Sequence, residues 1–163
     1  DLFPARPSGF VGLRFAQVNV PANSYVHTAH IVFTVHAVVT PSAIFDLTVK
    51  MHKVTDASVL TGQSDGYLQS LWTGGSTTES MTFSPVKSTS DTTFSGTTVG
   101  ELVTTPDISS IVEEVVGQAG WQANNAMVVL FGDSTNNANL KLDYMSYEGS
   151  LFYEGSPEKG PKL

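Results

Sequence analysis

Three segments in the first third of the chain alternate apolar and polar side chains with a period of two residues. Their apolar positions are Val11, Leu13 and Phe15, then Ala29, Ile31, Phe33 and Val35, and then Phe45, Leu47, Val49 and Met51. Successive side chains of a β-strand point to opposite faces of a sheet, so this alternation predicts strands that are buried on one face. Half-buried strands are typical of antiparallel sheets. The pattern therefore restricts the chain to a β-rich fold.

The second half of the chain adds strands of a different kind. Residues 126–131 are apolar without interruption, which predicts a strand in the middle of the fold. Residues 140–147 alternate again, and residues 80–85 are a weaker strand candidate. Over residues 55–98 as a whole, short apolar islands are scattered among Gly, Ser and Thr. We expect short strands and long surface loops there.

One helix is predicted, over residues 106–116. Thr105 is placed to cap it, Pro106 suits the first helical position, and Asp107 adds an acid to the first turn. The apolar residues that follow at the spacing of one helical face are Ile108, Ile111, Val112 and Val115. We expect this face to be buried against a sheet, with Trp121 folded back as a buried plug at the helix exit.

Composition narrows the class of protein. Charged residues make up only 14% of the chain, uncharged polar residues replace them, and cysteine is absent. Secreted and surface β-proteins coat their outer strand faces with uncharged polar residues, so we expect an extracellular or cell-surface protein. Its Ser/Thr-rich stretches would permit O-glycosylation, as in a glycoprotein. Without cysteine, disulfides and thiolate metal sites are excluded.

Charge and length exclude further classes. The formal net charge of −7 argues against nucleic acid as a partner, because little here could neutralise a row of phosphates. The same charge disfavours binding to an anionic membrane surface. No apolar run approaches the length that spans a bilayer, so no membrane span is expected. The 163 residues suit one domain over 1–163.

Several motifs, taken in order, resemble those of a known family. They are Val-Gly-Leu-Arg-Phe at 11–15, Val-Asn-Val-Pro-Ala at 18–22, Ala-His-Ile-Val-Phe at 29–33, the helix at 106–116, Gly-Trp-Gln-Ala-Asn-Asn-Ala-Met at 120–127, Ser-Tyr-Glu-Gly at 146–149 and Pro-Lys-Leu at 161–163. Together they resemble the secreted jelly-roll, carbohydrate-binding-module-like domains of bacterial and algal surface proteins. The resemblance implies an all-β fold, a jelly-roll-like antiparallel β-sandwich with one short α-helix.

The chain departs from this family pattern in two ways. Asn124 stands where the family has glycine, so we expect an asparagine in the left-handed conformation at that turn. Family members also carry fuller strands at both ends. The shorter ends here indicate either a trimmed segment or strands that a neighbouring chain supplies.

The residues argue against catalysis, and we predict a protein that is not an enzyme. The histidines are His27, His30, His36 and His52, and no Gly-x-Ser-x-Gly elbow accompanies them. Alternation places His30, His36 and His52 on outward strand faces. His30 and His36 would lie about 20 Å apart along a strand, too far to share one metal ion. A zinc-binding pair of His30 and His52 would need a favourable register between their strands.

Calcium is the candidate metal ion if the chain binds one. Related jelly-rolls hold calcium in loops, through carboxylate and carbonyl oxygens. The candidate ligands are Asp46, Asp133, Asp143 and Glu148, with Glu154 as a further loop acid. No EF-hand-like spacing fixes these residues, so solvated surface acids are the competing interpretation, with no cofactor at all.

Carbohydrate binding is one of two functional hypotheses. Proteins often hold a sugar ring against an exposed aromatic side chain, with polar groups around it. The candidate residues are Trp72 and Tyr67 in the loop-rich middle of the chain, and Tyr144 and Tyr147 near its end. The competing interpretation is that Trp72 belongs to the core and that the tyrosines cover a sheet edge. A polysaccharide would be the ligand.

Assembly is the other hypothesis, and the sequence favours it narrowly. Incomplete terminal strands would expose unpaired N–H and C=O groups, which template pairing with another chain. The candidate contacts are the apolar residues of the otherwise polar ends, namely Leu2, Phe3, Phe152, Tyr153 and Leu163. We predict an extracellular structural or adhesive module that self-associates or joins neighbouring surface-protein domains. A head-to-tail contact that does not close forms filaments.

Overall fold

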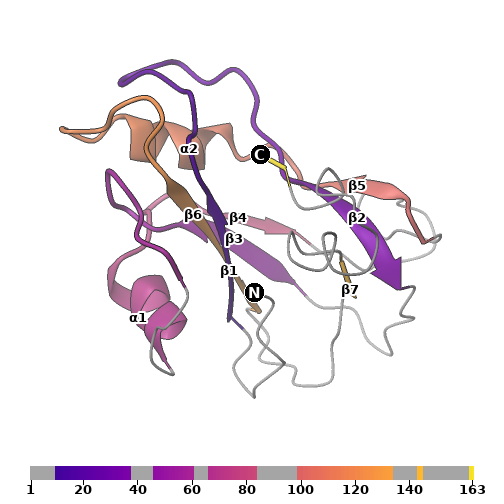
Figure 1. Ribbon diagram of the computed structural model, residues 1–163. Coiled ribbons are helices and arrows are strands. Elements are labelled where there is room, and N and C mark those ends of the chain that lie inside the picture. The colour runs from indigo at the N-terminus through magenta and orange to yellow at the C-terminus, as the bar shows by residue number, and fades with distance from the viewer. Residues whose placement is uncertain (1–9, 38–45, 61–65, 84–98, 134–142, 145–161) are drawn as a thin grey trace.

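The computed structural model describes residues 10–37, 46–60, 66–83, 99–133, 143–144 and 162–163 (Figure 1). In chain order its elements are β1 (Phe10–Phe15), β2 (Val32–Ala37), β3 (Leu47–Met51), α1 (Tyr67–Gly74), β4 (Met81–Phe83), β5 (Leu102–Thr104), α2 (Ser109–Val116), β6 (Met127–Asp133) and β7 (Asp143–Tyr144). Most of this regular structure is strand, which confirms a β-rich fold. Neither helix in this part of the chain is long and apolar enough to cross a membrane.

The strands form two antiparallel sheets. One has four strands in the order β1-β6-β3-β4, and the other has three in the order β5-β2-β7. Figure 1 shows β2 and β5 side by side, apart from the four-stranded sheet. The strand candidate at residues 80–85 is confirmed as β4, which pairs with β3. Of the alternating segment at residues 140–147, only β7 falls within the described residues.

Strand β6 lies inside the four-stranded sheet, as its apolar sequence predicts. It pairs with β1 on one side and with β3 on the other. Met127, Val129 and Phe131 join a core cluster shared with the second sheet and α2, whereas Val128 and Leu130 join a second cluster beneath α1. These five side chains are at most 5% exposed. Both faces of the strand are covered, which is why its sequence does not alternate.

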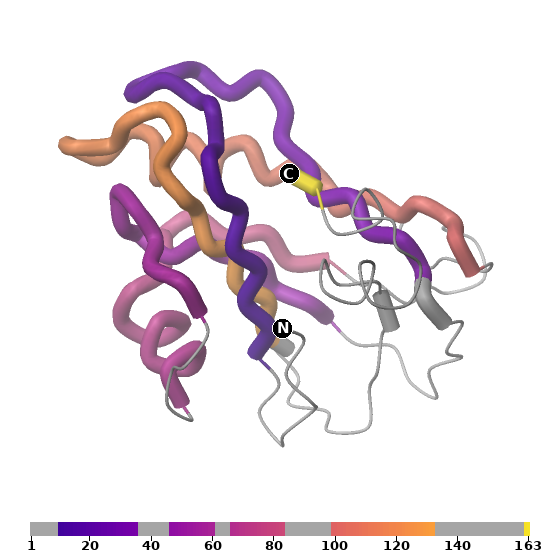
Figure 2. The backbone as a smooth tube through the Cα atoms, in the orientation of Figure 1, coloured from indigo at the N-terminus to yellow at the C-terminus, as the bar shows by residue number. Residues whose placement is uncertain are grey.

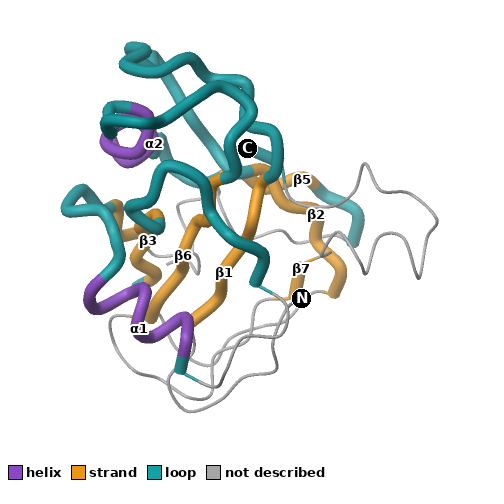
Figure 3. Tube along the Cα trace, turned by 60° about the vertical axis from the view of Figure 1, so that its left-hand side comes forward, coloured by secondary structure: helices purple, strands orange, loops and turns teal. Residues whose placement is uncertain are grey.

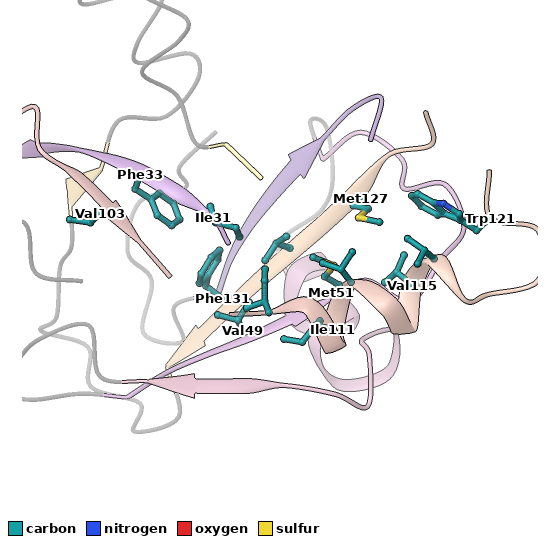
Figure 4. Packing of buried hydrophobic residues seen from close by; sticks show 14 of the residues in the cluster. Ile31, Phe33, Val49, Met51, Val103, Ile111, Val115, Trp121, Met127 and Phe131 are labelled. Atoms are coloured by element: carbon teal, nitrogen blue, oxygen red, sulfur yellow. The ribbon is translucent and has the colours of Figure 1, made fainter. Parts of the chain in front are cut away.

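The main core contains side chains from both sheets and from α2 (Figure 4). Phe33 of β2 and Phe131 of β6 pack edge to face, with ring centroids 5.8 Å apart, and so join the two sheets. Such aromatic pairs contribute about 0.5–1.5 kcal/mol beyond the area that they bury. Ile31 and Val49 are fully buried in the same cluster. The inward positions predicted from alternation are therefore confirmed for Ile31, Phe33, Val35, Val49 and Met51. Ala29 and Leu47 are partly buried, and Phe45 lies outside the described residues.

Helix α2 buries the predicted apolar face. The residues Ile108, Ile111, Val112 and Val115 are all at most 3% exposed. Figure 4 shows Ile111 and Val115 beside Met51 of β3. Trp121 beyond the helix exit is 3% exposed, and its Nε1–H donates a hydrogen bond to the Val20 carbonyl oxygen at 2.8 Å. The predicted helix face and the buried tryptophan are both confirmed.

The start of α2 differs from the prediction. The helix begins at Ser109 rather than at Pro106. The hydroxyl of Thr105 accepts the Ile31 N–H at 2.9 Å and does not cap the helix. The Oδ1 of Asp107 instead accepts the N–H of Ser109, the first residue of the helix, at 3.0 Å. The same atom accepts the N–H of Ala29 at 2.9 Å. These donors, first that of Ala29, lower the pKa of the Asp107 carboxyl.

Helix α1 contradicts the prediction of strands and loops for its region, so the described fold has two helices rather than one. Only Leu71 of α1 is buried, although Tyr67, Leu68 and Trp72 lie on the same face and pack against the same cluster. A Cβ atom at Gly12 would come within 2.8 Å of Leu68, and one at Gly132 within 2.8 Å of Trp72. The two strand glycines thus make the space that α1 occupies. Figure 3 shows α1 lying across this sheet, separate from α2.

Three loops meet at one end of the four-stranded sheet (Figure 2). They comprise residues 16–29, 52–60 and 117–126. Val18 N–H donates to the Asn125 carbonyl at 3.0 Å, and the Asn125 side chain donates to the Thr55 carbonyl at 2.8 Å. Asn124 has φ 74°, which confirms the left-handed asparagine expected at this turn. The loops are therefore fixed to one another as well as to the sheet.

Candidate functional site

The outer edge of β5 carries backbone groups that no described residue pairs with. Thr105 N–H donates to the Ile31 carbonyl, and Val35 N–H donates to the Glu101 carbonyl, both at 2.9 Å. These bonds show that the backbone N–H and C=O groups of the odd-numbered residues of this segment point toward β2. Backbone groups alternate between the two edges of a strand, so those of Leu102 and Thr104 face away from β2. Strand β5 is also the last strand of its sheet.

Apolar side chains accompany these backbone groups. Val103, in the middle of β5, points into the core and is 4% exposed, whereas Leu102 is 67% exposed. Val99, just before the strand, is 59% exposed. Thr104 is exposed as well. Val99, Leu102 and Thr104 together form a surface that we call the β5 edge, where free backbone groups and exposed apolar side chains coincide.

Strand β1 is also an edge strand, and side chains cover the face of it that lies under α1. Gly12 in its middle is buried, and the side chains of Leu68 and Leu60 lie against it. The Nε of Arg14 donates to the Ala57 carbonyl at 2.9 Å, which holds the loop of residues 52–60 against the strand. The β5 edge has no comparable cover among the described residues.

The second edge of β2 is paired within the chain. Val32 and Lys162 exchange two backbone hydrogen bonds, of 2.9 and 3.0 Å, and Val35 lies opposite Tyr144 of β7. Leu163, one of the predicted assembly residues, is 40% exposed next to this bridge. The other predicted assembly residues lie outside the described part of the chain, namely Leu2, Phe3, Phe152 and Tyr153.

Two predicted sugar-contacting residues, Trp72 and Tyr67, lie in α1 rather than in a loop. The Trp72 ring is half-buried and tilted against Phe10, with ring centroids 5.3 Å apart. The Nζ of Lys50 lies over the same ring, 4.9 Å from its centroid, and the ring edge rests on Gly132. Tyr67 is half-buried and packs against the cluster beneath α1. Trp72 therefore already has structural contacts on several sides.

Of the two remaining predicted aromatic residues, only Tyr144 falls within the described part of the chain. Tyr144 lies in β7, which belongs to the three-stranded sheet rather than to the sheet under α1. Tyr147 lies outside the described residues. The structure therefore assigns Tyr144 to a different sheet from the one that carries Trp72 and Tyr67.

The candidate calcium ligands are spread over both sheets. Asp46 directly precedes β3 and Asp133 ends β6, and the pairing of Leu47 with Asp133 places these two backbones at the same end of the sheet. Asp143 pairs with Ala37 in the other sheet. Glu148 and Glu154 lie outside the described residues. Among the described residues, no three His, Asp or Glu side chains lie close enough together to hold a metal ion.

The histidines are less exposed than alternation suggests. His30 is half-buried, with its Nδ1 2.8 Å from the Thr105 carbonyl oxygen. His52 is also half-buried at the end of β3, and this burial lowers its pKa. His30 precedes β2 and His52 follows β3, which lie in different sheets. The two histidines therefore do not face each other across neighbouring strands, which a shared zinc ion would have required. His36 lies in β2.

Sequence reasoning did not identify the β5 edge. Strand β5 has three residues, too few for a period of two to be recognised. A weak signal exists, because Val99 and Leu102 are apolar residues in a stretch of Gly, Glu and Thr. Tyr25, which is 82% exposed, was also missed, since nothing in the sequence marks it as a surface residue.

Comparison with known proteins adds no relative. No protein-family model, no curated protein and no solved structure matches the chain.

Proposed function

We propose that the chain is an extracellular structural or adhesive surface module that associates by adding a strand from a neighbour to the β5 edge. The observation that carries this proposal is the outward-facing backbone of Leu102 and Thr104, next to the exposed side chains of Leu102 and Val99. An unpaired strand edge is a template for pairing with another chain. The proposal gives the protein no catalytic role.

A jelly-roll-like β-sandwich is the fold that belongs to this proposal. Its support is the core cluster to which both antiparallel sheets contribute, with the Phe33–Phe131 contact between them. In such a fold the sheets bury their inner faces against each other, and the ends of the sheets stay available. The low fraction of charged residues, 14%, supports an extracellular location.

Strand addition at the β5 edge would use both backbone and side chains. Each of Leu102 and Thr104 offers one N–H and one C=O group to an incoming strand. A hydrogen bond of this kind contributes about 0.5–1.5 kcal/mol net. The apolar surface of Leu102 and Val99 would contact alternate side chains of that strand. Leu2 and Phe3 of a neighbouring copy are the donors that we propose, and neighbouring surface-protein domains would bind in the same way.

Leu102→Pro tests this proposal. Proline lacks the outward-facing N–H, and edge strands tolerate it because that N–H does not bond to the next strand of the sheet. We expect the variant to lose self-association while its thermal midpoint changes little. Sedimentation velocity across a concentration series measures the association, and electron micrographs show whether filaments form. Leu102→Lys is a second variant, which places a charge on the edge without changing the backbone.

Val59→Lys is the matched control. Val59 is 56% exposed, so the change removes a similar apolar surface and adds the same charge away from β5. The control should associate like the unchanged chain. A monomeric unchanged chain at high concentration would contradict the proposal, and so would Leu102 variants that associate normally.

Carbohydrate binding is the second candidate function. The observation that favours it is Tyr25, an aromatic side chain that is 82% exposed on a loop held by several hydrogen bonds. Exposed aromatic rings are a common means of binding a sugar through its apolar face. Retention of the native chain in gels that contain polysaccharides tests this function.

A further inference from the structure

The loop that joins β1 to β2 carries the most exposed aromatic side chain of the described residues, Tyr25. On either side of it the backbone is fixed to α2. Asn23 N–H donates to the Val116 carbonyl at 3.0 Å, and Val26 N–H donates to Oε1 of Glu113 at 2.8 Å. The ring is therefore presented to solvent by a backbone that is held in place.

Further hydrogen bonds hold both ends of this loop. At its start, the Val20 carbonyl accepts the indole N–H of the buried Trp121 at 2.8 Å. At its end, Ala29 N–H donates to Asp107 at 2.9 Å. Between them, Ser24 closes a turn onto the Pro21 carbonyl through its N–H and its hydroxyl. A loop fixed in this way loses little conformational entropy when a ligand binds to it.

Two exposed polar residues, Asn23 and His27, lie close to Tyr25 in the chain. The His27 ring lies with its centroid 6.4 Å from that of Tyr25, tilted by 52°, and its side chain is exposed. Asn23 is exposed and has φ 56°, a left-handed conformation that asparagine tolerates better than most residues. An aromatic face beside an imidazole and an amide combines apolar contact with hydrogen bonding.

The charge near the loop selects among polar ligands. Glu113 and Asp107 both bind backbone N–H groups of this loop and thus place two carboxylates next to it. The chain as a whole has a formal net charge of −7. Like charges repel, so this surface disfavours uronates, sulfated glycans and other anions. A neutral ligand with hydroxyl groups is compatible with it.

We infer that Tyr25, His27 and Asn23 form a binding site for a neutral saccharide, with one face of a pyranose ring stacked on Tyr25. His27 and Asn23 would hydrogen-bond to the hydroxyl groups at the ring edge. This inference rests on the carbohydrate-binding alternative and names the site for it. It does not depend on strand addition at β5, which lies in the three-stranded sheet.

Affinity gel electrophoresis tests the site, with separate gels that contain a neutral β-glucan, a neutral mannan, a neutral galactan or an acidic polyuronate. We expect at least one neutral polymer to retain the chain and the polyuronate not to do so. Tyr25→Ala should weaken retention about tenfold, as the loss of a central aromatic contact does. Tyr25→Phe keeps the ring and should stay within about twofold of the unchanged chain.

Two comparisons make the outcome clear. Tyr25 is 82% exposed, so Tyr25→Ala should keep its thermal midpoint, which separates lost binding from unfolding. Val59→Ala removes an exposed apolar side chain elsewhere on the surface and should leave the affinity unchanged. If a neutral polymer retains the unchanged chain and Tyr25→Ala equally, the site is wrong although the carbohydrate function stands. If no neutral polymer retains the unchanged chain, the function and the site both fail. Retention by the polyuronate alone, or binding to peptides instead, would overturn the ligand class.

Discussion

The two helices contact the rest of the molecule in opposite ways. Helix α2 buries a stripe of its own side chains, and its acidic residues bind loops on either side. Helix α1 buries only Leu71 fully and lies where strand glycines leave room for it. The hydrogen bonds of its own side chains stay within the helix, as those of Ser70 and Thr73 do. Helix α2 thus depends on its own buried side chains, whereas the position of α1 depends also on the space above the two strand glycines.

The largest expected effect concerns α2. Ile111→Ala removes a fully buried side chain from the centre of its stripe. Core truncations of this kind destabilise a protein by about 2–5 kcal/mol. Urea unfolding followed by circular dichroism measures the free energy of unfolding. Val59→Ala, at an exposed position, is the control and should change it by less than about 0.5 kcal/mol. A change that small for Ile111→Ala would mean that the stripe faces water.

The next effect concerns the space beneath α1. Gly132→Ala adds a Cβ that would come within 2.8 Å of the Trp72 ring and 3.1 Å of the Phe10 ring. Overpacking of this kind costs about 1–3 kcal/mol, because the tryptophan or the helix has to shift. Urea unfolding and the near-ultraviolet circular dichroism of the Trp72 environment measure the result.

Gly74→Ala is the matched control for that change. Gly74 is the last residue of α1, and nothing lies within 4 Å of the Cβ that the same substitution would add there. Alanine favours helix over glycine by about 1 kcal/mol in a helix interior, so at this end the change should be neutral or mildly stabilising. Equal effects at the two glycines would show that α1 does not depend on the gap at Gly132.

The contrast between the helices also explains what the sequence could predict. The stripe of α2 is local information, so the helix and its buried face follow from spacing alone. Its cap does not, because the Thr105 hydroxyl bonds to Ile31, a residue that only the folded chain brings near. Helix α1 has one buried residue, and its contacts depend on Gly12 and Gly132, which are far away in the sequence. The apolar residues of α1 do lie at helical spacing, but no local pattern predicts the space at those two glycines.

The same reasoning applies to the candidate sites. Alternation predicts which residues of β2 and β3 face the core, because burial on one face is a property of each strand. It does not predict which strand ends a sheet, so the β5 edge becomes visible only with the strand order. The exposure of Tyr25 likewise depends on how Asn23 and Val26 bind to α2. For Trp72 the sequence was misleading, because its position among Gly and Ser residues suggests a loop, whereas the residue lies in α1.

The smallest effect concerns the polar contacts of α2. The Glu114 carboxylate accepts the N–H groups of Thr78 and Glu79 at 2.9 and 2.8 Å, and lies 2.7 Å from Nζ of Lys53. Burial opposes its ionisation, but these three donors outweigh burial and lower the pKa of Glu114. A carboxylate whose pKa is lower in the folded than in the unfolded chain stabilises the fold above about pH 4.5, the ordinary value. That contribution declines as the pH falls through the lower, folded value.

Glu114→Gln isolates this contribution. Hydrogen bonds to a charged group contribute about 1.5–3 kcal/mol each, but Lys53 is half exposed and glutamine keeps one acceptor, so we expect a net loss of about 1 kcal/mol at pH 7. The difference between the two proteins should shrink as the pH falls below about 4.5 and through the lower pKa of the folded chain, because Glu114 then becomes neutral like glutamine. Asp107 and His52 also have lowered pKa values, but they titrate in both proteins and cancel in that difference. Glu79→Gln changes the net charge equally at an exposed position and should change the free energy of unfolding at pH 7 by less than about 0.5 kcal/mol. A difference for Glu114→Gln that stays constant from pH 7 to pH 3 would mean that the carboxylate does not hold α2 to the segment after α1, and the two helices would then differ only in their apolar contacts.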